Sequence, residues 1–145
     1  MLAQTDDYVG DVLATLEEQG LKDNAIVIFT SDNGREGIPR SFGFTGPWRA
    51  GMFSPYEGSL RVPFLIRWPG KIPAGRVSNE VVHQIDLFPT VASIVGEALP
   101  TDRIYDGKSQ LDFFTGKTDK SPRESMVVYI GNTLFGAKWR NWKIL

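Results

Sequence analysis

Residues 25–34 read AIVIFTSDNG, an apolar run that ends in a polar turn. The run AIVIFT is continuously apolar and rich in β-branched residues, which predicts a strand covered on both faces, as in a parallel sheet. Residues 6–19 precede it and place their apolar side chains at helical spacing, which predicts a helix. The apolar stripe of this helix consists of Val9, Val12, Leu13 and Leu16. A helix, a short connection and a buried strand in this order are typical of α/β architecture.

The polar turn Ser31-Asp32-Asn33-Gly34 lies at the carboxyl end of the predicted strand. In open α/β sheets this edge is where ligands bind. The carboxylate of Asp32 and the amide oxygen of Asn33 are hard donors, which suit calcium or magnesium better than zinc. Calcium takes about six to eight oxygen ligands, so two residues are not a complete site. A structural alternative stays open, because Asp-Asn-Gly is also a common turn sequence.

The remainder of the first hundred residues continues the α/β pattern. Residues 35–60 show no periodicity and are predicted to form a long, shaped loop. Residues 62–68 form a second candidate strand, and a helix is predicted to begin at Asp86 and to end at Gly96. We therefore expect residues 1–100 to form a partial parallel or mixed sheet with flanking helices, as the C-terminal portion of a larger α/β domain.

The pattern of predicted elements changes after residue 100. Residues 126–130 are predicted to form a strand, Gly131-Asn132 a turn, and residues 135–145 one or two further strands. We expect residues 101–145 to begin a small antiparallel subdomain. The predicted fold class is therefore α/β, with a small C-terminal antiparallel sheet added to the partial sheet.

Composition excludes several function classes for this chain. Its 16 basic and 17 acidic residues give a net charge of −1, which offers no general electrostatic case for binding nucleic acid or an anionic membrane. No stretch reaches the roughly 18 consecutive apolar residues of a membrane-spanning helix. Without cysteine the chain holds no disulfide, thiolate zinc site or cysteine nucleophile. The single histidine, His83, excludes a multi-histidine metal site, and no G-x-S-x-G sequence for a Ser-His-Asp triad accompanies it. We expect a structural role for His83.

Residues 46–63 carry groups suited to an anionic ligand. Arg49 or Arg35 would bind an oxyanion, because the planar guanidinium group makes two aligned hydrogen bonds. Glu57 and Arg61 are expected to pair with each other and to fix the loop. The aromatic side chains of the segment either line a substrate pocket or fill the core beneath the loop. They are Trp48, Phe53 and Tyr56.

Four stretches carry a family pattern. They are Leu21–Gly34 (LKDNAIVIFTSDNG), Gly46–Gly75 (GPWRAGMFSPYEGSLRVPFLIRWPGKIPAG), Asp86–Thr90 (DLFPT) and Lys138–Leu145 (KWRNWKIL). In this order they resemble the C-terminal part of formylglycine-dependent sulfatases, the arylsulfatase family within the alkaline-phosphatase-like superfamily. The resemblance implies that Asp32 and Asn33 bind a divalent cation, usually Ca2+, with Mg2+ or Mn2+ as alternatives. It also implies that the intact enzyme hydrolyses a sulfate ester.

The chain also departs from the family pattern. Formylglycine arises from the cysteine or serine of C/S-x-P-S/A-R, which these residues do not contain, and Asp6 and Asp7 do not match the family's first pair of metal-binding aspartates. Met52 stands where the pattern P-L-R-G-G-K places a sulfate-binding lysine, and methionine neither carries a charge nor donates a hydrogen bond. Arg49 is the candidate to replace that contact. The resemblance therefore implies a fragment that holds no catalytic residue, is inactive alone, and has its formylglycine in a missing upstream part.

Two alternatives to the sulfatase interpretation stay open. One is a phosphodiesterase or phosphonate hydrolase of the same superfamily, although such enzymes commonly have histidine where this chain has Asn33. The other is a non-catalytic, truncated interaction piece, which the absent nucleophile motif and Met52 favour. A sheet edge that a missing part would cover also predicts self-association of the fragment. The sequence predicts no compartment, although a periplasmic or secreted intact enzyme is compatible with the resemblance.

Overall fold

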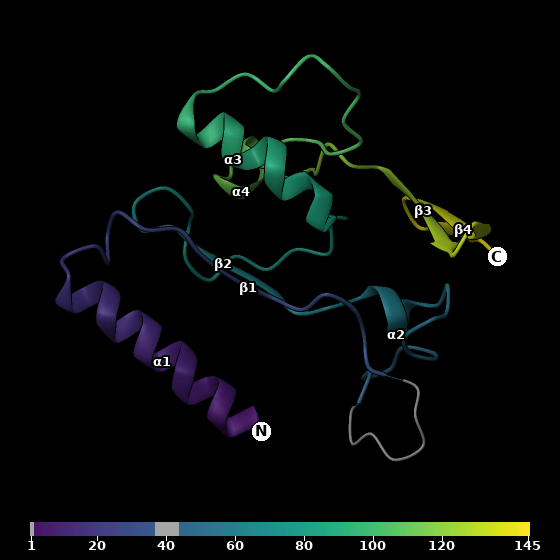
Figure 1. Cartoon of the computed structure of the whole chain (residues 1–145), viewed down its shortest axis with the longest axis horizontal. Coiled ribbons are helices and arrows are strands. Elements are labelled where there is room, and N and C mark those ends of the chain that lie inside the picture. The colour runs from purple at the N-terminus through teal and green to yellow at the C-terminus, as the bar shows by residue number, and fades with distance from the viewer. Residues whose placement is uncertain (1, 37–43) are drawn as a thin grey trace.

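The computed structural model describes residues 2–36 and 44–145. Its helices are α1 (Leu2–Glu18), α2 (Glu57–Leu60), α3 (Leu87–Val95) and α4 (Leu111–Phe114), with a 3-10 turn, η1, at Gln84–Asp86. Its strands are β1 (Val27–Thr30), β2 (Phe64–Arg67), β3 (Ser125–Ile130), β4 (Thr133–Trp139) and β5 (Trp142–Ile144). In Figure 1, α1 lies on one side of the β1–β2 pair, and α3 with α4 lies on the other. The mixed α/β composition predicted from the sequence is therefore confirmed.

The two strands of the first sheet run antiparallel. Val27 pairs with Arg67 at one end, and Thr30 pairs with Phe64 at the other. Among the described residues the parallel or mixed sheet is not seen, and for this pair the parallel prediction is wrong. Continuous apolarity indicates that both faces of a strand avoid water, but it does not report the direction of the neighbouring strand. In this chain the faces are not fully covered either, since Phe29 is 40% and Leu65 is 60% exposed.

Helix α1 forms as predicted but begins earlier, so Asp6 and Asp7 lie beyond its first turn. Its end is a glycine cap: Gly20 has a φ of +68°, and the amide of Leu21 donates to the carbonyl of Leu16 over 2.8 Å. None of its residues is buried. No helix in the described parts of the chain has the length and apolarity that crossing a bilayer requires.

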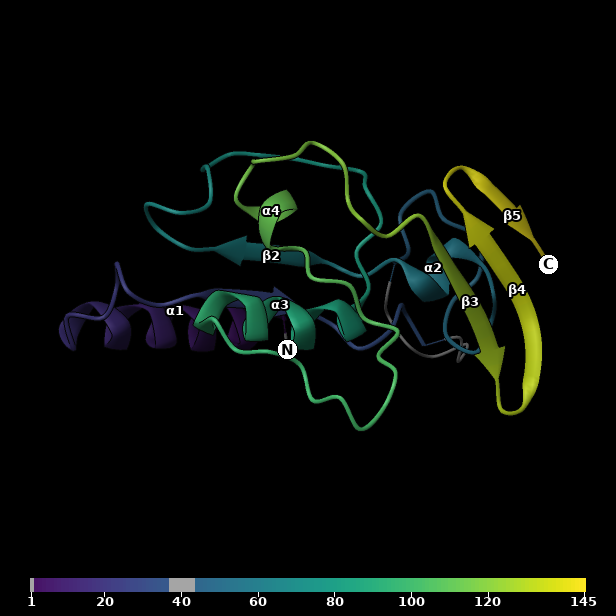
Figure 2. The same ribbon diagram turned by 90° about the horizontal axis from the view of Figure 1, so that it is seen from above.

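The C-terminal strands form a separate three-stranded antiparallel sheet in the order β3-β4-β5. Gly131 has a φ of +58° and turns the chain between β3 and β4, so the predicted hairpin is confirmed. Residues 135–145 supply parts of two strands, β4 and β5. Figure 2 shows this curled sheet beside α2. The division of the chain at residue 100 stays a prediction.

Apolar burial is limited in this chain. Of the described residues, only Phe113, Phe114 and Val128 are buried hydrophobic side chains. The accessible surface is 10827 Å². A compact folded monomer of this mass exposes about 7,500 Å². The chain therefore leaves a large apolar surface that it does not cover itself.

Candidate cation site at the end of β1

Asp32 and Asn33 follow β1 after one residue, Ser31, and form a short polar loop with it. The backbone amide of Asn33 donates to Oδ1 of Asp32 over 2.9 Å, and Oγ of Ser31 donates to the same oxygen over 3.3 Å. The side-chain Nδ2 of Asn33 donates to the carbonyl of Gly34 over 2.8 Å, a bond that engages the nitrogen and not the amide oxygen. Asp32 is exposed and Asn33 is half-buried. The loop thus carries a carboxylate and a side-chain amide on consecutive residues just past the end of the strand.

The segment that begins at Phe44 packs against this loop. The amide of Gly34 donates to the carbonyl of Ser59 over 2.8 Å, and the amide of Met52 donates to the carbonyl of Arg35 over 2.7 Å. Met52, at the position of the family lysine, therefore lies next to the Asp-Asn loop. Residues 37–43 of the predicted long loop lie outside the described residues. The segment after them is mainly irregular apart from the short helix α2.

Glycine allows the backbones of the loop and of α2 to meet. A Cβ placed on Gly34 would lie 1.9 Å from the carbonyl oxygen of Gly58, far inside van der Waals contact. A Cβ on Gly58 would in turn lie 2.1 Å from the carbonyl oxygen of Ala50. Both obstacles are backbone atoms, so neither can move without moving the loop. These two glycines set the distance between the Asp-Asn turn and the segment beneath it.

We expect Gly34→Ala to destabilise the chain by about 1–3 kcal/mol, the usual effect of overpacking. Gly10→Ala is the matched control, because a Cβ at Gly10 meets nothing within 4 Å in the middle of α1. That control should be neutral or stabilising by up to about 1 kcal/mol, since alanine favours helix. The free energy of unfolding in urea compares the two variants. Equal values for both would contradict the proposed close approach.

The guanidinium group of Arg49 lies against an aromatic ring rather than against the Asp-Asn pair. The guanidinium of Arg49 lies 4.2 Å from the centre of the Tyr56 ring, and its backbone carbonyl accepts from the amide of Gly58. Among the described residues the structure records no contact between Arg49 and Asp32 or Asn33. A role of Arg49 or Arg35 in binding an anion stays a prediction.

Glu57 is surrounded by three cationic groups. The predicted pair is confirmed, with Nε of Arg61 2.7 Å from Oε2 of Glu57. Sequence reasoning missed the two other partners, Lys138 and Lys143, whose Nζ atoms lie 3.2 Å and 3.0 Å from Oε1. They come from β4 and β5, more than 80 positions away, and no local pattern points to them. The cluster attaches the C-terminal sheet to α2.

The charges in this cluster determine how Glu57 titrates. Partial burial acts to raise its pKa, but hydrogen bonds from Arg61, Lys143 and Lys138 outweigh burial and lower the pKa from 4.5 to about 2. The lowered pKa means that stabilisation by Glu57 is complete above about pH 4.5 and is lost as the pH falls towards 2.

We expect the wild type to lose about 1–2 kcal/mol more stability than Glu57→Gln between pH 5 and pH 2.5, after allowance for solvent screening. Glutamine does not titrate, so the difference between the two chains isolates this carboxylate. Urea unfolding at the two pH values measures it, with Glu18→Gln on α1 as the control. Parallel pH profiles of wild type and Glu57→Gln would show that the cations do not stabilise Glu57.

His83 has the structural role that was predicted. It caps η1: Nδ1 of His83 accepts from the amide of Ile85 over 3.3 Å, and the amide of His83 donates to Oδ2 of Asp86 over 2.9 Å. Burial, with Arg123 nearby, lowers the pKa of His83, and the charge of Asp86 only partly opposes this. A neutral ring is the form that can accept the bond from Ile85.

The predicted helix from Asp86 to Gly96 is confirmed as α3, with Gly96 in the left-handed conformation at its end. Asp86 is the N-cap residue, but its carboxylate does not cap α3. The carboxylate is fully buried and accepts three hydrogen bonds from Arg123, at 2.6–3.0 Å. Burial would raise the pKa of Asp86, but the bonds from Arg123 and from the amides of His83 and Lys108 outweigh it and lower the pKa.

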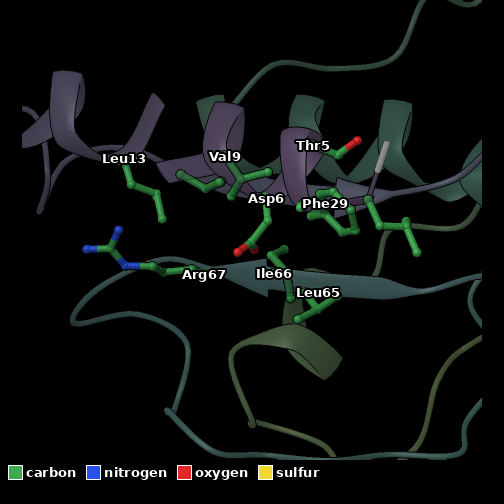
Figure 3. A pocket seen from close by; sticks show the side chains of 11 residues that line it. Thr5, Asp6, Val9, Leu13, Phe29, Leu65, Ile66 and Arg67 are labelled. Atoms are coloured by element: carbon green, nitrogen blue, oxygen red, sulfur yellow. The ribbon is translucent and has the colours of Figure 1, made fainter. Parts of the chain in front are cut away.

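One apolar hollow lies away from the Asp-Asn pair. Figure 3 shows it between α1 on one side and the β1–β2 pair on the other. Its volume is about 760 Å³, and Val9, Leu13, Phe29 and Leu65 are among its lining residues. Since Asp32 and Asn33 are not part of the lining, this hollow is an uncovered face of the sheet rather than a cation site.

The described residues contain no group of three or more histidine, cysteine, aspartate or glutamate side chains able to hold a metal ion. Asp32 and Asn33 fit a hard cation in donor chemistry, because both offer oxygen. Two residues supply fewer than the about six to eight oxygens that calcium takes, so Asp32 and Asn33 would bind the cation only together with further ligands.

Comparison with known proteins decides the family. The family model described as Sulfatase matches residues 1–97. This chain belongs to the sulfatase family. It is 36% identical to human arylsulfatase D, over 97% of the chain and 26% of that protein, and 38% identical to rat steryl-sulfatase, over 94% of the chain and 25% of that protein. The chain therefore spans about a quarter of the length of these curated relatives.

Solved structures agree with membership of the sulfatase family. The crystal structure of PsFucS1 sulfatase from Pseudoalteromonas sp. superposes with a TM-score of 0.89 at 31% identity, over 97% of this chain and 28% of that one. A phosphonate monoester hydrolase from Silicibacter pomeroyi superposes less well, with a TM-score of 0.62 at 27% identity, over 84% of this chain and 22% of that one. The family resemblance seen in the sequence is confirmed.

Proposed function

We propose that the chain is the C-terminal portion of a metal-dependent sulfuric ester hydrolase. Residues 1–100 are the C-terminal portion of its α/β catalytic domain, including strands of a parallel or mixed sheet to which other parts of the protein contribute. Residues 101–145 begin its small antiparallel subdomain. The observation that carries this proposal is the pair of oxygen donors at the end of β1, in a chain that belongs to the sulfatase family. The chain alone is not expected to be active.

In the proposed enzyme a divalent cation, Ca2+ or else Mg2+ or Mn2+, stabilises negative charge on the sulfate group, and a formylglycine outside this chain supplies the nucleophile. The chain contributes Asp32 and Asn33 as oxygen ligands of that cation. Ser31 and the backbone amide of Asn33 orient the carboxylate of Asp32 through Oδ1. The hydrogen bond from the amide of Gly34 to the carbonyl of Ser59 fixes the position of the loop relative to α2. Arg49 is the group proposed to bind the anionic substrate, since Met52 cannot.

Substrate preference tests the proposal against its nearest alternative. The intact polypeptide that carries this chain should hydrolyse 4-nitrophenyl sulfate in the presence of calcium, and chelation should abolish the activity. A phosphonate or phosphodiester hydrolase would instead prefer an aryl phosphodiester or an aryl phosphonate monoester, and the weaker structural likeness to the phosphonate monoester hydrolase keeps this candidate in the test. Preference for either phosphorus ester by a factor of ten or more would overturn the sulfatase proposal.

The isolated chain is expected to self-associate. β1 and β2 form a two-stranded sheet in which, within residues 2–36 and 44–145, no further strand pairs with either outer edge, and Phe29 and Leu65 present exposed apolar side chains on it. Such edges and apolar patches pair with other chains. Sedimentation velocity should show dimers or larger species at micromolar concentration, and fewer of them for Leu65→Lys. A monomer at every concentration would rule out this interaction and weaken the alternative of a non-catalytic interaction piece.

A further inference from the structure

Gln84 of η1 touches the backbone of the candidate cation loop. Its Nε2 donates to the carbonyl of Ser31, although the two residues are 53 positions apart. Ser31 is the residue directly before Asp32, and its own hydroxyl donates to Oδ1 of Asp32. The carbonyl that Gln84 holds thus belongs to the peptide group that leads into Asp32. A restraint at this point limits how the Asp32 carboxylate can turn.

The turn that carries Gln84 is itself fixed. η1 begins with reciprocal hydrogen bonds in which His83 caps Ile85 and Asp86 accepts from the amide of His83. The amide of Asp86 donates back to the carbonyl of His83 over 2.8 Å. Gln84 lies between these two capping residues, so its backbone has little freedom of its own.

A buried polar network anchors η1 to a distant part of the chain. Asp86 is 0% exposed and Arg123 is 7% exposed, and Gln110 donates to Oδ2 of Asp86 over 3.0 Å. Oγ of Ser121 lies 3.0 Å from the side-chain carbonyl oxygen of Gln110 and 2.6 Å from the carbonyl oxygen of Val81, and its single proton is within reach of both acceptors. Gln110, Ser121 and Arg123 all lie beyond residue 97, where the family match ends. The polar network that anchors η1, and through Gln84 the Asp-Asn loop, therefore includes residues outside the matched region.

We propose that Gln84 is a positioning residue for the cation site, which holds the Ser31 peptide and so aims Asp32 and Asn33. The proposal rests on the function proposed above. Gln84 does not touch the cation, and it acts only through the backbone of the loop. Its side chain is exposed, so the bond is expected to restrain the loop without contributing much to overall stability.

Hydrogen exchange on the chain itself tests the restraint without any metal. Gln84→Met keeps the volume of the side chain and removes the donor, whereas Gln84→Glu places an acceptor against a carbonyl. The backbone amides of Asn33 and Gly34 report the loop, because both are hydrogen-bonded in the native loop. We expect their exchange to rise about three- to tenfold in Gln84→Met, the effect of one modest hydrogen bond, and further in Gln84→Glu.

Gln4→Met is the matched control, because Gln4 donates an exposed hydrogen bond to Tyr8 far along α1. It should leave exchange at Asn33 and Gly34 unchanged. Unfolding free energies of all three variants should equal that of the wild type, which separates a positioning role from a merely structural one. Unchanged loop exchange in both Gln84 variants would overturn the proposal.

Calcium binding by the intact polypeptide provides the second readout. Isothermal titration with calcium chloride should show a Kd raised about three- to tenfold in Gln84→Met and unchanged in Gln4→Met. If the wild type binds calcium and Gln84→Met binds it equally well, positioning by Gln84 fails while the proposed function stands. If the wild type binds no calcium, the proposed function fails, and the exchange data alone then show whether Gln84 restrains the loop.

Discussion

Asp32→Ala in the intact polypeptide is expected to reduce calcium-dependent hydrolysis of 4-nitrophenyl sulfate by more than about 100-fold. Changes to the outer partners of metal ligands typically cost 10–100-fold, and Asp32 is proposed as a ligand itself. Asp32→Asn keeps one oxygen donor and removes the charge, so its loss should be smaller and partly restored by millimolar calcium. Initial rates against calcium concentration measure both effects.

Asp7→Ala is the control for this comparison, because Asp7 is an exposed carboxylate on α1 that does not match a family ligand. It should leave the calcium dependence unchanged. Retention of wild-type rates by Asp32→Ala, within threefold, would remove Asp32 from the cation site and favour the interpretation of the Asp-Asn-Gly sequence as a plain turn.

The second large effect is expected at Arg123. Arg123→Met should destabilise the chain by about 3–5 kcal/mol, because it leaves the fully buried carboxylate of Asp86 without its charged partner. The guanidinium also donates to the carbonyls of Asp106 and Ser125, over 2.7 Å and 3.2 Å, and these would lose a donor as well. Urea unfolding followed by circular dichroism gives the change.

A double variant distinguishes a charge pair from simple packing. Asp86→Asn combined with Arg123→Met removes both charges, so the pair of changes should cost less than the sum of the two single changes. Arg103→Met serves as the surface control, since Arg103 pairs with Asp102 in an exposed position and should show no measurable change. Additive effects of the two buried changes would mean that Asp86 and Arg123 do not stabilise each other.

Local patterns in the sequence predicted most of the elements and their order. The stripe of α1, the β-branched run of β1 and the Gly131 turn are determined by neighbours within a few residues, and the structure has all three. The early start of α1 at Leu2 was not predicted, because the apolar stripe that placed the helix begins at Val9. The ends of a helix are less sharply defined than its apolar stripe, and their position shifts by a few residues.

Long-range partners could not be predicted from the sequence. Asp86 was correctly placed at the start of a helix, but its carboxylate binds Arg123, 37 positions away, rather than the helix amides. The direction of β2 against β1 was missed for the same reason, because an apolar run does not identify its neighbour. Lys138 and Lys143 lie next to Glu57 only because the C-terminal sheet packs against α2, a tertiary contact that no local pattern indicates.

The candidate site was predicted in part. Asp32 and Asn33 stand together at the end of β1, as the sequence indicated, because consecutive residues after a strand need no tertiary contact to be neighbours. Their cation binding stays a prediction, as does the role of Arg49. The restraint from Gln84 could not be predicted, since it depends on how η1 folds back onto the loop.

The most direct measurement is a crystal structure of the intact polypeptide with bound calcium. We predict an ion with oxygens of Asp32 and Asn33 at about 2.3–2.6 Å, the usual calcium–oxygen distance. An ion bound elsewhere, with both side chains turned away from it, would contradict the proposed role of Asp32 and Asn33 as cation ligands.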